Sequence, residues 1–358
     1  MLRTLQTFPL HKDSAWDLAW NHQKNILASC SSDKTIRIFK EQMNQKTKKN
    51  EWICSSILEE SHEKTIRSVD WSLDGKYLAS CSFDGIVNVW KYSLKNGQND
   101  FECIASLEGH ANEVKRVKWI FSTESKNLLA TCGRDKTIWI WEQINETEYE
   151  CLAVLTGHSG DVKYISWMND SKFLISSSYD ETVKVWQKSK DENHWLSLDT
   201  LAGHNSTIWC CKPCGNNCIL SCDQDNKIIL WKPKTDIETL PEQKFLSGYS
   251  LFEEDSEKTE KNKIWQKFVV ISNAHKRPIY SLEIIEPLTE SNSELIFLTG
   301  SGDNSICIFS VIDSEVKIRS RYENAHPNDV NCVLYLKEKE MITSCCEDGI
   351  IKFWNFKK

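Results

Sequence analysis

The chain contains one short pattern seven times, and this repetition constrains its fold more than any other feature. Each copy has a His, then apolar stretches that lead to a Ser or Thr, then an Asp four residues later and an aromatic residue six residues after that. The His and Asp residues of the seven copies are His11 and Asp33, His62 and Asp84, His110 and Asp135, His158 and Asp180, His204 and Asp225, His275 and Asp303, and His326 and Asp348. A period of about 50 residues is typical of repeat proteins whose units stack on one another.

The residue types within each copy predict short strands rather than helices. Aromatic and β-branched residues come in bursts separated by Gly, Asn, Asp and Ser, and the 358 residues include 15 Trp. A small four-stranded sheet cannot cover both of its own faces, but a ring of such sheets supplies each face with a neighbour. We therefore predict an all-β fold, with residues 1–358 forming a single seven-bladed β-propeller.

The seven copies resemble the WD40 (WD-repeat) family along the whole chain. The resemblance rests on the hydroxyl residues four positions before each Asp and on the terminal aromatics, which are Phe39, Trp90, Trp141, Trp186, Trp231, Phe309 and Trp354. In a tight turn between two strands, the Asp can accept a hydrogen bond from the His, and the hydroxyl and indole groups can extend this network. Phe39 and Phe309 have no N–H to donate, so we expect the first and sixth blades to be the least rigid.

Three segments stand outside the regular spacing. Residues 2–8 align with the outer strands that precede later repeats, so we expect them to pair with the last blade and close the ring. Residues 234–263 are charged and aperiodic, and they predict a mobile loop between the fifth and sixth blades. A shorter polar insert, residues 42–50, lies in the first blade.

Charge and hydropathy exclude several classes of partner. The formal net charge is −7, and no block of consecutive Lys and Arg offsets it, so we expect neither direct nucleic-acid binding nor membrane binding. The first residues lack the apolar core of a signal peptide, and no run of about 18 apolar residues occurs. These features predict a soluble intracellular protein.

The Cys, His and Asp residues could suggest a metal site or an enzyme, but the repeat explains most of them. Cys210, Cys211, Cys214, Cys218 and Cys222 form a local cluster, yet Cys recurs three residues before the Asp in five copies, as a small apolar residue. The 15 Cys are expected to be reduced thiols. A catalytic His–Asp pair would break the symmetry in one place, whereas here all seven copies carry one. We predict no metal, no cofactor and no catalysis.

One set of positions varies between the copies in a way that favours binding. Five residues after each His, at the predicted start of the innermost strand, stand Trp16, Arg67, Lys115, Lys163, Trp209, Tyr280 and Asn331. The residues just before the turn Asp should project on the same face, and there they add Phe83, Arg134 and Tyr179. Trp, Tyr and Arg are enriched at the centres of protein interfaces. We predict a partner-binding rim around one end of the central channel.

Several longer stretches resemble one subfamily, the WD-repeat subunits of the cytosolic iron-sulfur protein assembly (CIA) targeting complex. They include HEKTIRSVDW, GHANEVKRVKW, LLATCGRDKTIWIWE, YECLAVLTGHSGDVKYISW, SSSYDETVKVW and AHKRPIYSL. The resemblance implies a scaffold that joins a small subunit to a helical-repeat adaptor and helps deliver iron-sulfur clusters to apoproteins in the cytoplasm and nucleus. It also implies that Arg134 is a functional surface residue, and that recipients ending in an acidic residue and an aromatic one would suit the rim.

A rival interpretation is a WD-repeat scaffold or substrate receptor in another complex, such as a ubiquitin ligase. A receptor of that class would carry Trp-Asp-x-Arg after a third strand or an F-box ahead of the propeller, and the chain has neither.

Overall fold

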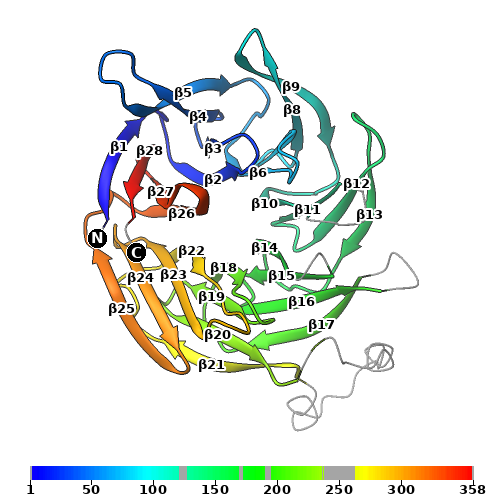
Figure 1. Cartoon of the computed structure of the whole chain (residues 1–358). Coiled ribbons are helices and arrows are strands. Elements are labelled where there is room, and N and C mark those ends of the chain that lie inside the picture. The colour runs from blue at the N-terminus through cyan, green and yellow to red at the C-terminus, as the bar shows by residue number, and fades with distance from the viewer. Residues whose placement is uncertain are drawn as a thin grey trace.

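The computed structural model is a ring of seven four-stranded antiparallel sheets around a central channel (Figure 1). It describes residues 2–120, 127–168, 172–189, 195–235, 237 and 263–356. Within these residues Lys337–Lys339 form a 3-10 turn, and no helix is long and apolar enough to cross a membrane. The prediction of an all-β, seven-bladed propeller is confirmed.

In each blade the first strand borders the channel and the fourth lies at the outer edge (Figure 1). The first three blades consist of β2 (Ala15–Asn21), β3 (Ile26–Ser31), β4 (Ile36–Met43) and β5 (Asn50–Leu58); β6 (Ile66–Trp71), β7 (Tyr77–Ser82), β8 (Val87–Lys95) and β9 (Gln98–Leu107); and β10 (Val114–Trp119), β11 (Leu128–Gly133), β12 (Ile138–Gln143) and β13 (Tyr149–Leu155).

The next three blades follow the same order. They consist of β14 (Val162–Met168), β15 (Phe173–Ser178), β16 (Thr182–Lys188) and β17 (Trp195–Ala202); β18 (Ile208–Pro213), β19 (Ile219–Asp223), β20 (Ile228–Pro233) and β21 (Trp265–Ile271); and β22 (Ile279–Glu286), β23 (Glu294–Ser301), β24 (Ile306–Ile312) and β25 (Glu315–Tyr322).

The seventh blade combines the two ends of the chain. Its inner strands are β26 (Val330–Leu336), β27 (Met341–Cys346) and β28 (Ile350–Asn355), and its outer strand is β1 (Arg3–Pro9). β1 pairs antiparallel with β28 from Arg3 opposite Asn355 to Pro9 opposite Ile350. The ring therefore has no open seam between its first and last blades.

The second strand of each blade is buried along its whole length, except at Glu294 of β23, because a neighbouring blade covers each face of its sheet. Cys30, Cys81 and Cys132, in the second strands of the first three blades, are 0% exposed and pack among apolar side chains. These thiols act as small core residues, and burial raises the pKa of each of them.

The repeated polar residues form a buried hydrogen-bonded network in most blades. In the fourth blade, His158 Nδ1 lies 2.7 Å from Asp180 Oδ2 and Nε2 lies 2.7 Å from Ser176 Oγ, while the indole of Trp186 donates to the same Oγ at 2.8 Å. Such networks stabilise a fold when every member has a partner.

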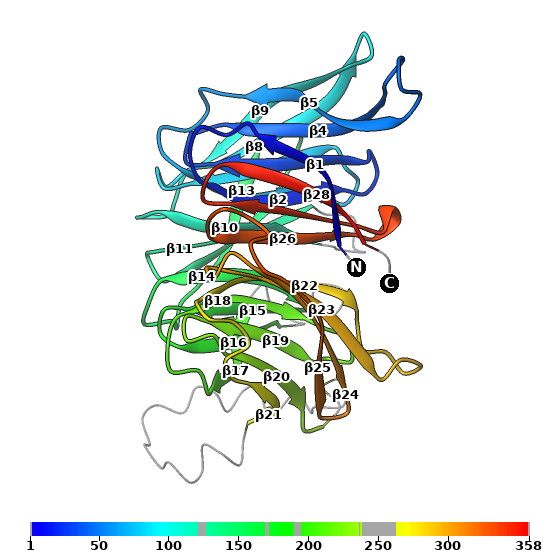
Figure 2. The ribbon, with the colours of Figure 1, turned by 90° about the vertical axis from the view of Figure 1, so that its left-hand side faces the viewer.

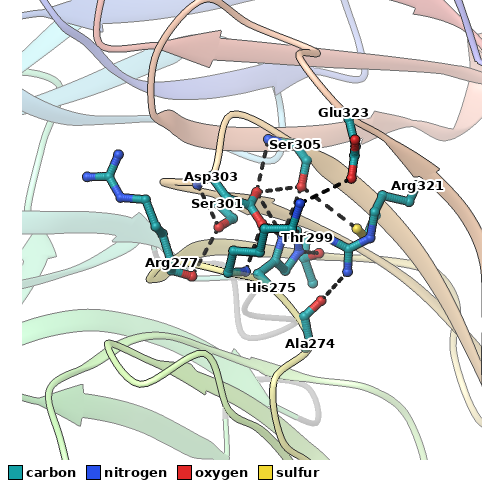
Figure 3. Close-up of polar contacts among 11 residues, drawn as sticks. Ala274, His275, Arg277, Thr299, Ser301, Asp303, Ser305, Arg321 and Glu323 are labelled. Carbon is teal, nitrogen blue, oxygen red and sulfur yellow. Dashed lines mark hydrogen bonds and ion pairs between the residues drawn. The ribbon is translucent and has the colours of Figure 1, made fainter.

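The sixth blade shows how a network adapts to the loss of the terminal indole (Figure 3). His275 Nε2 lies 2.6 Å from Thr299 Oγ1, and Nδ1 lies 3.1 Å from Asp303 and 3.0 Å from Ser305 Oγ. Arg321, from the outer strand, lies 3.6 Å from the Asp303 carboxylate and donates to the Ala274 carbonyl. An arginine thus extends this network where an indole cannot.

Two blades differ from the predicted His–Asp pairing. In the fifth blade, His204 Nδ1 lies 2.6 Å from Asp223 and not beside Asp225, because Asp223 occupies the strand position that carries a shorter Ser in most blades and its carboxylate reaches the ring. In the seventh blade, Asp348 is exposed and lies 3.4 Å from Asn328, so His326 Nδ1 has no partner among the described residues. The pairing of His204 with Asp225 and that of His326 with Asp348 were wrong.

The two predicted insertions have different outcomes. Most of the expected loop at residues 234–263 lies outside the described residues. The polar insert at residues 42–50 is not a separate loop, because Gln42 and Met43 extend β4, Asn50 begins β5, and Met43 pairs with Asn50. The insert therefore lengthens a hairpin.

Candidate functional site at the rim of the channel

Every predicted rim residue of the innermost strands lies at the same structural position. Each is the second residue of its strand, where the register with the next strand shifts and one residue is left without a cross-strand partner. These residues are Trp16, Arg67, Lys115, Lys163, Trp209, Tyr280 and Asn331. All seven are partly exposed. A β-bulge re-aims the side chain of the extra residue and is often found beside functional sites.

The rim residues before each turn are held by the strand starts that they face. The backbone N–H of Arg134 donates to the Glu113 carbonyl at 2.9 Å, and that of Tyr179 donates to the Asp161 carbonyl at 2.9 Å. The side chains of Arg134 and Tyr179 are 58% and 61% exposed. The turn residues therefore surround the bulged residues on the same face.

Cations and aromatic rings alternate across neighbouring blades. Lys163 Nζ lies 5.4 Å from the centre of the Trp209 ring and 5.7 Å from that of Tyr179, and Trp209 meets Tyr280 edge to face at 5.4 Å. Lys115 Nζ lies 4.0 Å from the centre of the Phe83 ring. On the first two blades, Arg67 lies over the Trp16 ring at 4.8 Å. Such contacts hold the aromatic rings in place while leaving their other faces available.

Three carboxylates that were not predicted from the sequence complete the rim. Glu113 lies 3.1 Å from Arg134 and 3.5 Å from Lys115, and Asp161 lies 3.1 Å from Lys163. Asp329 accepts a hydrogen bond from the Tyr280 hydroxyl at 3.2 Å. All three stand three residues after a repeat His, so the same spacing argument could have found them.

Because these carboxylates pair with neighbouring cations, the rim is not simply a basic surface. Burial lowers the pKa of Lys115, Glu113 opposes that shift, and the nearby charge of Lys163 adds to it. Burial and the neighbouring Asp329 carboxylate raise the pKa of Tyr280 to about 12, so its hydroxyl stays protonated and can donate. An added carboxylate near Lys115 would favour the charged lysine.

A second ring of side chains lies one residue further along the same strands, inside the channel. Arg116 forms a 2.8 Å ion pair with Asp17 and donates to the Tyr164 hydroxyl at 3.2 Å, so three blades are joined. Ser68 also donates to Asp17, at 2.7 Å. Burial alone would raise the pKa of Asp17, but the arginine, nearby Lys118 and the serine hold it below its ordinary value.

The cavity among the side chains that line the channel is small. Side chains of both rings surround a cavity of about 30 Å³, which has room for about one water molecule. Among the described residues, no group of three His, Cys, Asp or Glu side chains could hold a metal ion. Burial raises the pKa of Cys218 to about 11, which disfavours the thiolate that metals require. The geometry suits contact with a partner at the rim.

Comparisons with known proteins agree with this architecture. The WD40 family model (WD domain, G-beta repeat) matches residues 2–40, 52–91, 101–142, 149–187, 195–232 and 318–355. The chain is 32% identical to a probable cytosolic iron-sulfur protein assembly protein 1 of Candida dubliniensis, across 99% of this chain and 100% of that protein.

Two further relatives extend the similarity. The corresponding protein of Candida albicans is 31% identical across 99% of this chain and 100% of that protein. A probable cytosolic Fe-S cluster assembly factor of Schizosaccharomyces pombe is 30% identical across 99% of this chain and 54% of that protein. The seven-bladed ring and this end-to-end similarity show that the chain belongs to the cytosolic iron-sulfur protein assembly protein 1 family of WD40-repeat proteins.

Proposed function

We propose that this propeller is a non-catalytic docking subunit of the cytosolic iron-sulfur cluster assembly machinery. The names of its relatives support a role in cytosolic iron-sulfur protein assembly. Its work is to hold a small subunit, a helical-repeat adaptor and the apoproteins that receive clusters, in the cytoplasm and also in the nucleus. The clusters are cargo, and they are not bound by the propeller itself.

This proposal rests on the β-bulge at the second residue of all seven innermost strands. Regular pairing would have been enough to build the sheets, yet each strand leaves one residue unpaired at the same end of the channel. The residues presented there are mainly aromatic or cationic, which suits an interface and not a reaction.

The chemistry of the rim favours a short acidic and aromatic segment such as the end of a recipient protein. An aromatic ring of the ligand packs against Trp209 and Tyr280, whose rings already meet edge to face. Carboxylates of the ligand lie near Lys115 and Arg134, which share Glu113 as their partner. Exchange of that shared carboxylate for a ligand carboxylate keeps both cations paired.

The test is the affinity of the purified propeller for a peptide that ends in an acidic and an aromatic residue. Reversal of charge in the Lys115→Glu/Arg134→Glu double variant should weaken binding by at least tenfold, because two cations become two further anions beside Glu113. Fluorescence anisotropy measures the affinity, and pull-down of iron-sulfur apoproteins checks it with whole recipients.

Lys136→Glu is the matched control for this test. Lys136 is exposed in the same turn as Arg134, and the equivalent position of the fourth blade, Glu181, carries a Glu with nearly the same positive φ. The control should bind as the wild type does. Equal binding by the double variant and the wild type would contradict the proposed role of the rim.

A further inference from the structure

The hairpins at the outer edge of the first two blades are longer than the propeller needs. β4 and β8 continue four and five residues beyond their terminal aromatics, Phe39 and Trp90, whereas the equivalent strands of the other blades continue one to three residues. The ends of the two hairpins project beyond the body of the ring (Figure 2). Their outer parts add nothing to the core between blades.

The two projecting hairpins are joined to each other and fixed at their base. Asn99 of β9 donates to the Ser55 hydroxyl of β5 at 2.9 Å and accepts from the Tyr92 hydroxyl at 3.1 Å. Tyr92 also packs against Phe101 at 5.2 Å and edge to face against Trp71 at 6.0 Å. These contacts hold the pair of hairpins in one arrangement.

Between the hairpins lies a hollow of about 360 Å³, which we call the hairpin groove. Its walls include Lys24 and Lys40 from the first blade and Tyr92, Leu94 and Asn99 from the second. At 62% exposure, Leu94 is the most exposed large apolar side chain among the described residues. An apolar side chain is therefore exposed to solvent at the edge of a concave surface.

A second apolar side chain marks the other hairpin. Met43, at the end of β4, is 53% exposed and pairs in register with Asn50, which also lines the hairpin groove. The outer parts of both hairpins thus present an apolar residue toward solvent.

The hairpin groove is basic although the protein as a whole is acidic. Lys24 and Lys40 line it, and Lys46, Lys48 and Lys49 occupy the turn between β4 and β5. None of these five lysines forms an ion pair with another part of the described chain. Glu41 also lines the groove but is paired with Lys339 at 2.7 Å, and Glu51 keeps its charge because its hydrogen-bond donors, Asn44 and Thr47, are neutral. The five lysines outnumber these two carboxylates. The positive charge is therefore available to a partner.

We infer that the hairpin groove is a second docking surface, which binds a carboxylate-rich protein segment carrying an apolar side chain. Carboxylates of that segment pair with the turn lysines, and its apolar side chain covers Leu94 in the groove wall. A protein segment can fill a concave polar-walled hollow, whereas a flat anionic bilayer would bring its charge against Asp100 and Glu102 on β9. This inference rests on the proposed function, because the segment belongs to a partner subunit of the assembly.

The test uses the whole propeller with the purified small subunit and helical-repeat adaptor, without a recipient. The Lys46→Glu/Lys49→Glu double variant and the Leu94→Ser variant should each weaken binding of one of the two subunits at least tenfold, with unchanged thermal midpoints because all three side chains are exposed. The double variant should also show a weaker dependence of affinity on salt. Zero-length crosslinking should join the turn lysines of the wild type to Asp or Glu residues of the same subunit.

The matched control is the sixth-blade hairpin, where Lys317 is 68% exposed and Ile312 is 37% exposed. The Lys317→Glu/Ile312→Ser variant should bind both subunits normally. If the wild type and both hairpin-groove variants bound the subunits equally, the docking surface would be overturned while the proposed function stood.

Two further outcomes separate the remaining possibilities. Failure of the wild type to bind either subunit would contradict the proposed function itself. A different outcome is that the wild type binds phosphatidylserine vesicles, while the hairpin-groove variants lose this binding but keep normal subunit binding. That result would identify a lipid surface as the ligand in place of the protein segment and overturn the inference.

Discussion

Two rings of side chains surround the channel, one residue apart on the same seven strands, and they differ in almost every physical respect. The rim residues are bulged, partly exposed and paired through cation–π contacts and surface carboxylates. The residues of the inner ring, such as Asp17, Arg116 and Tyr164, are buried and joined directly across blades. A shift of one residue thus separates side chains that present a surface from side chains that hold the blades together.

The largest effect should come from breaking the inner ring. Arg116→Leu leaves the Asp17 carboxylate buried without its cationic partner, which we expect to lower the free energy of unfolding by about 3–5 kcal/mol. Urea denaturation followed by Trp fluorescence measures the change. The Asp17→Leu/Arg116→Leu double variant should be more stable than Arg116→Leu alone, because it removes both charges. A loss below about 1 kcal/mol in Arg116→Leu would show that the inner ring is not structural.

The next effect should come from the rim and appear in binding rather than in stability. Trp209 contacts Lys163 and Tyr280 at the surface, so Trp209→Ala should weaken binding of an acidic–aromatic peptide by about 2 kcal/mol, or roughly 30-fold. Isothermal titration calorimetry measures the affinity. Thermal unfolding of the same variant provides the control, since a large drop in its midpoint would place Trp209 with the inner ring.

Acid should weaken the inner ring through Asp17. The folded-state pKa of Asp17 lies below its ordinary value of 3.8, so the unfolded chain takes up this proton first and stability falls as the pH drops below about 4. The Asp17→Leu/Arg116→Leu variant lacks this carboxylate and should lose less stability between pH 5 and pH 3 than the wild type does. Equal losses, measured by urea denaturation at each pH, would remove Asp17 from the acid response.

The smallest effect should come from a single hydrogen-bonding side chain in each ring. Tyr164→Phe removes the oxygen that accepts from Arg116 and should cost about 1 kcal/mol of unfolding free energy. Asn331→Ala removes one rim hydrogen bond to the Ala15 carbonyl and should cost less than about 1 kcal/mol, because water can replace the amide. A larger cost for Asn331→Ala than for Tyr164→Phe would reverse the order that we infer for the two rings.

The repeat spacing predicted the blades and the placement of the rim residues because both depend on local strand geometry. It did not predict the pairing of Asp17 with Arg116, since these residues are 99 positions apart in sequence and meet only after three blades have assembled. Nor did it predict that His204 would bond to Asp223, because side-chain reach within one turn decided that choice. The hairpin groove was missed for a related reason: three of its five lysines, Lys46, Lys48 and Lys49, lie in a segment that was interpreted only as an insert.

The pairing of β1 with β28 has a consequence for how the protein is made. The outer strand of the seventh blade is synthesised before the other strands of the propeller, and its hydrogen-bonding partner is synthesised after them. During synthesis the nascent chain therefore carries an unpaired strand edge, and the sixth blade lacks its next neighbour until the last strands of the propeller have been made. We expect this protein to depend on chaperones during translation, and a stalled or prematurely terminated chain should be degraded rather than accumulate as a partial ring.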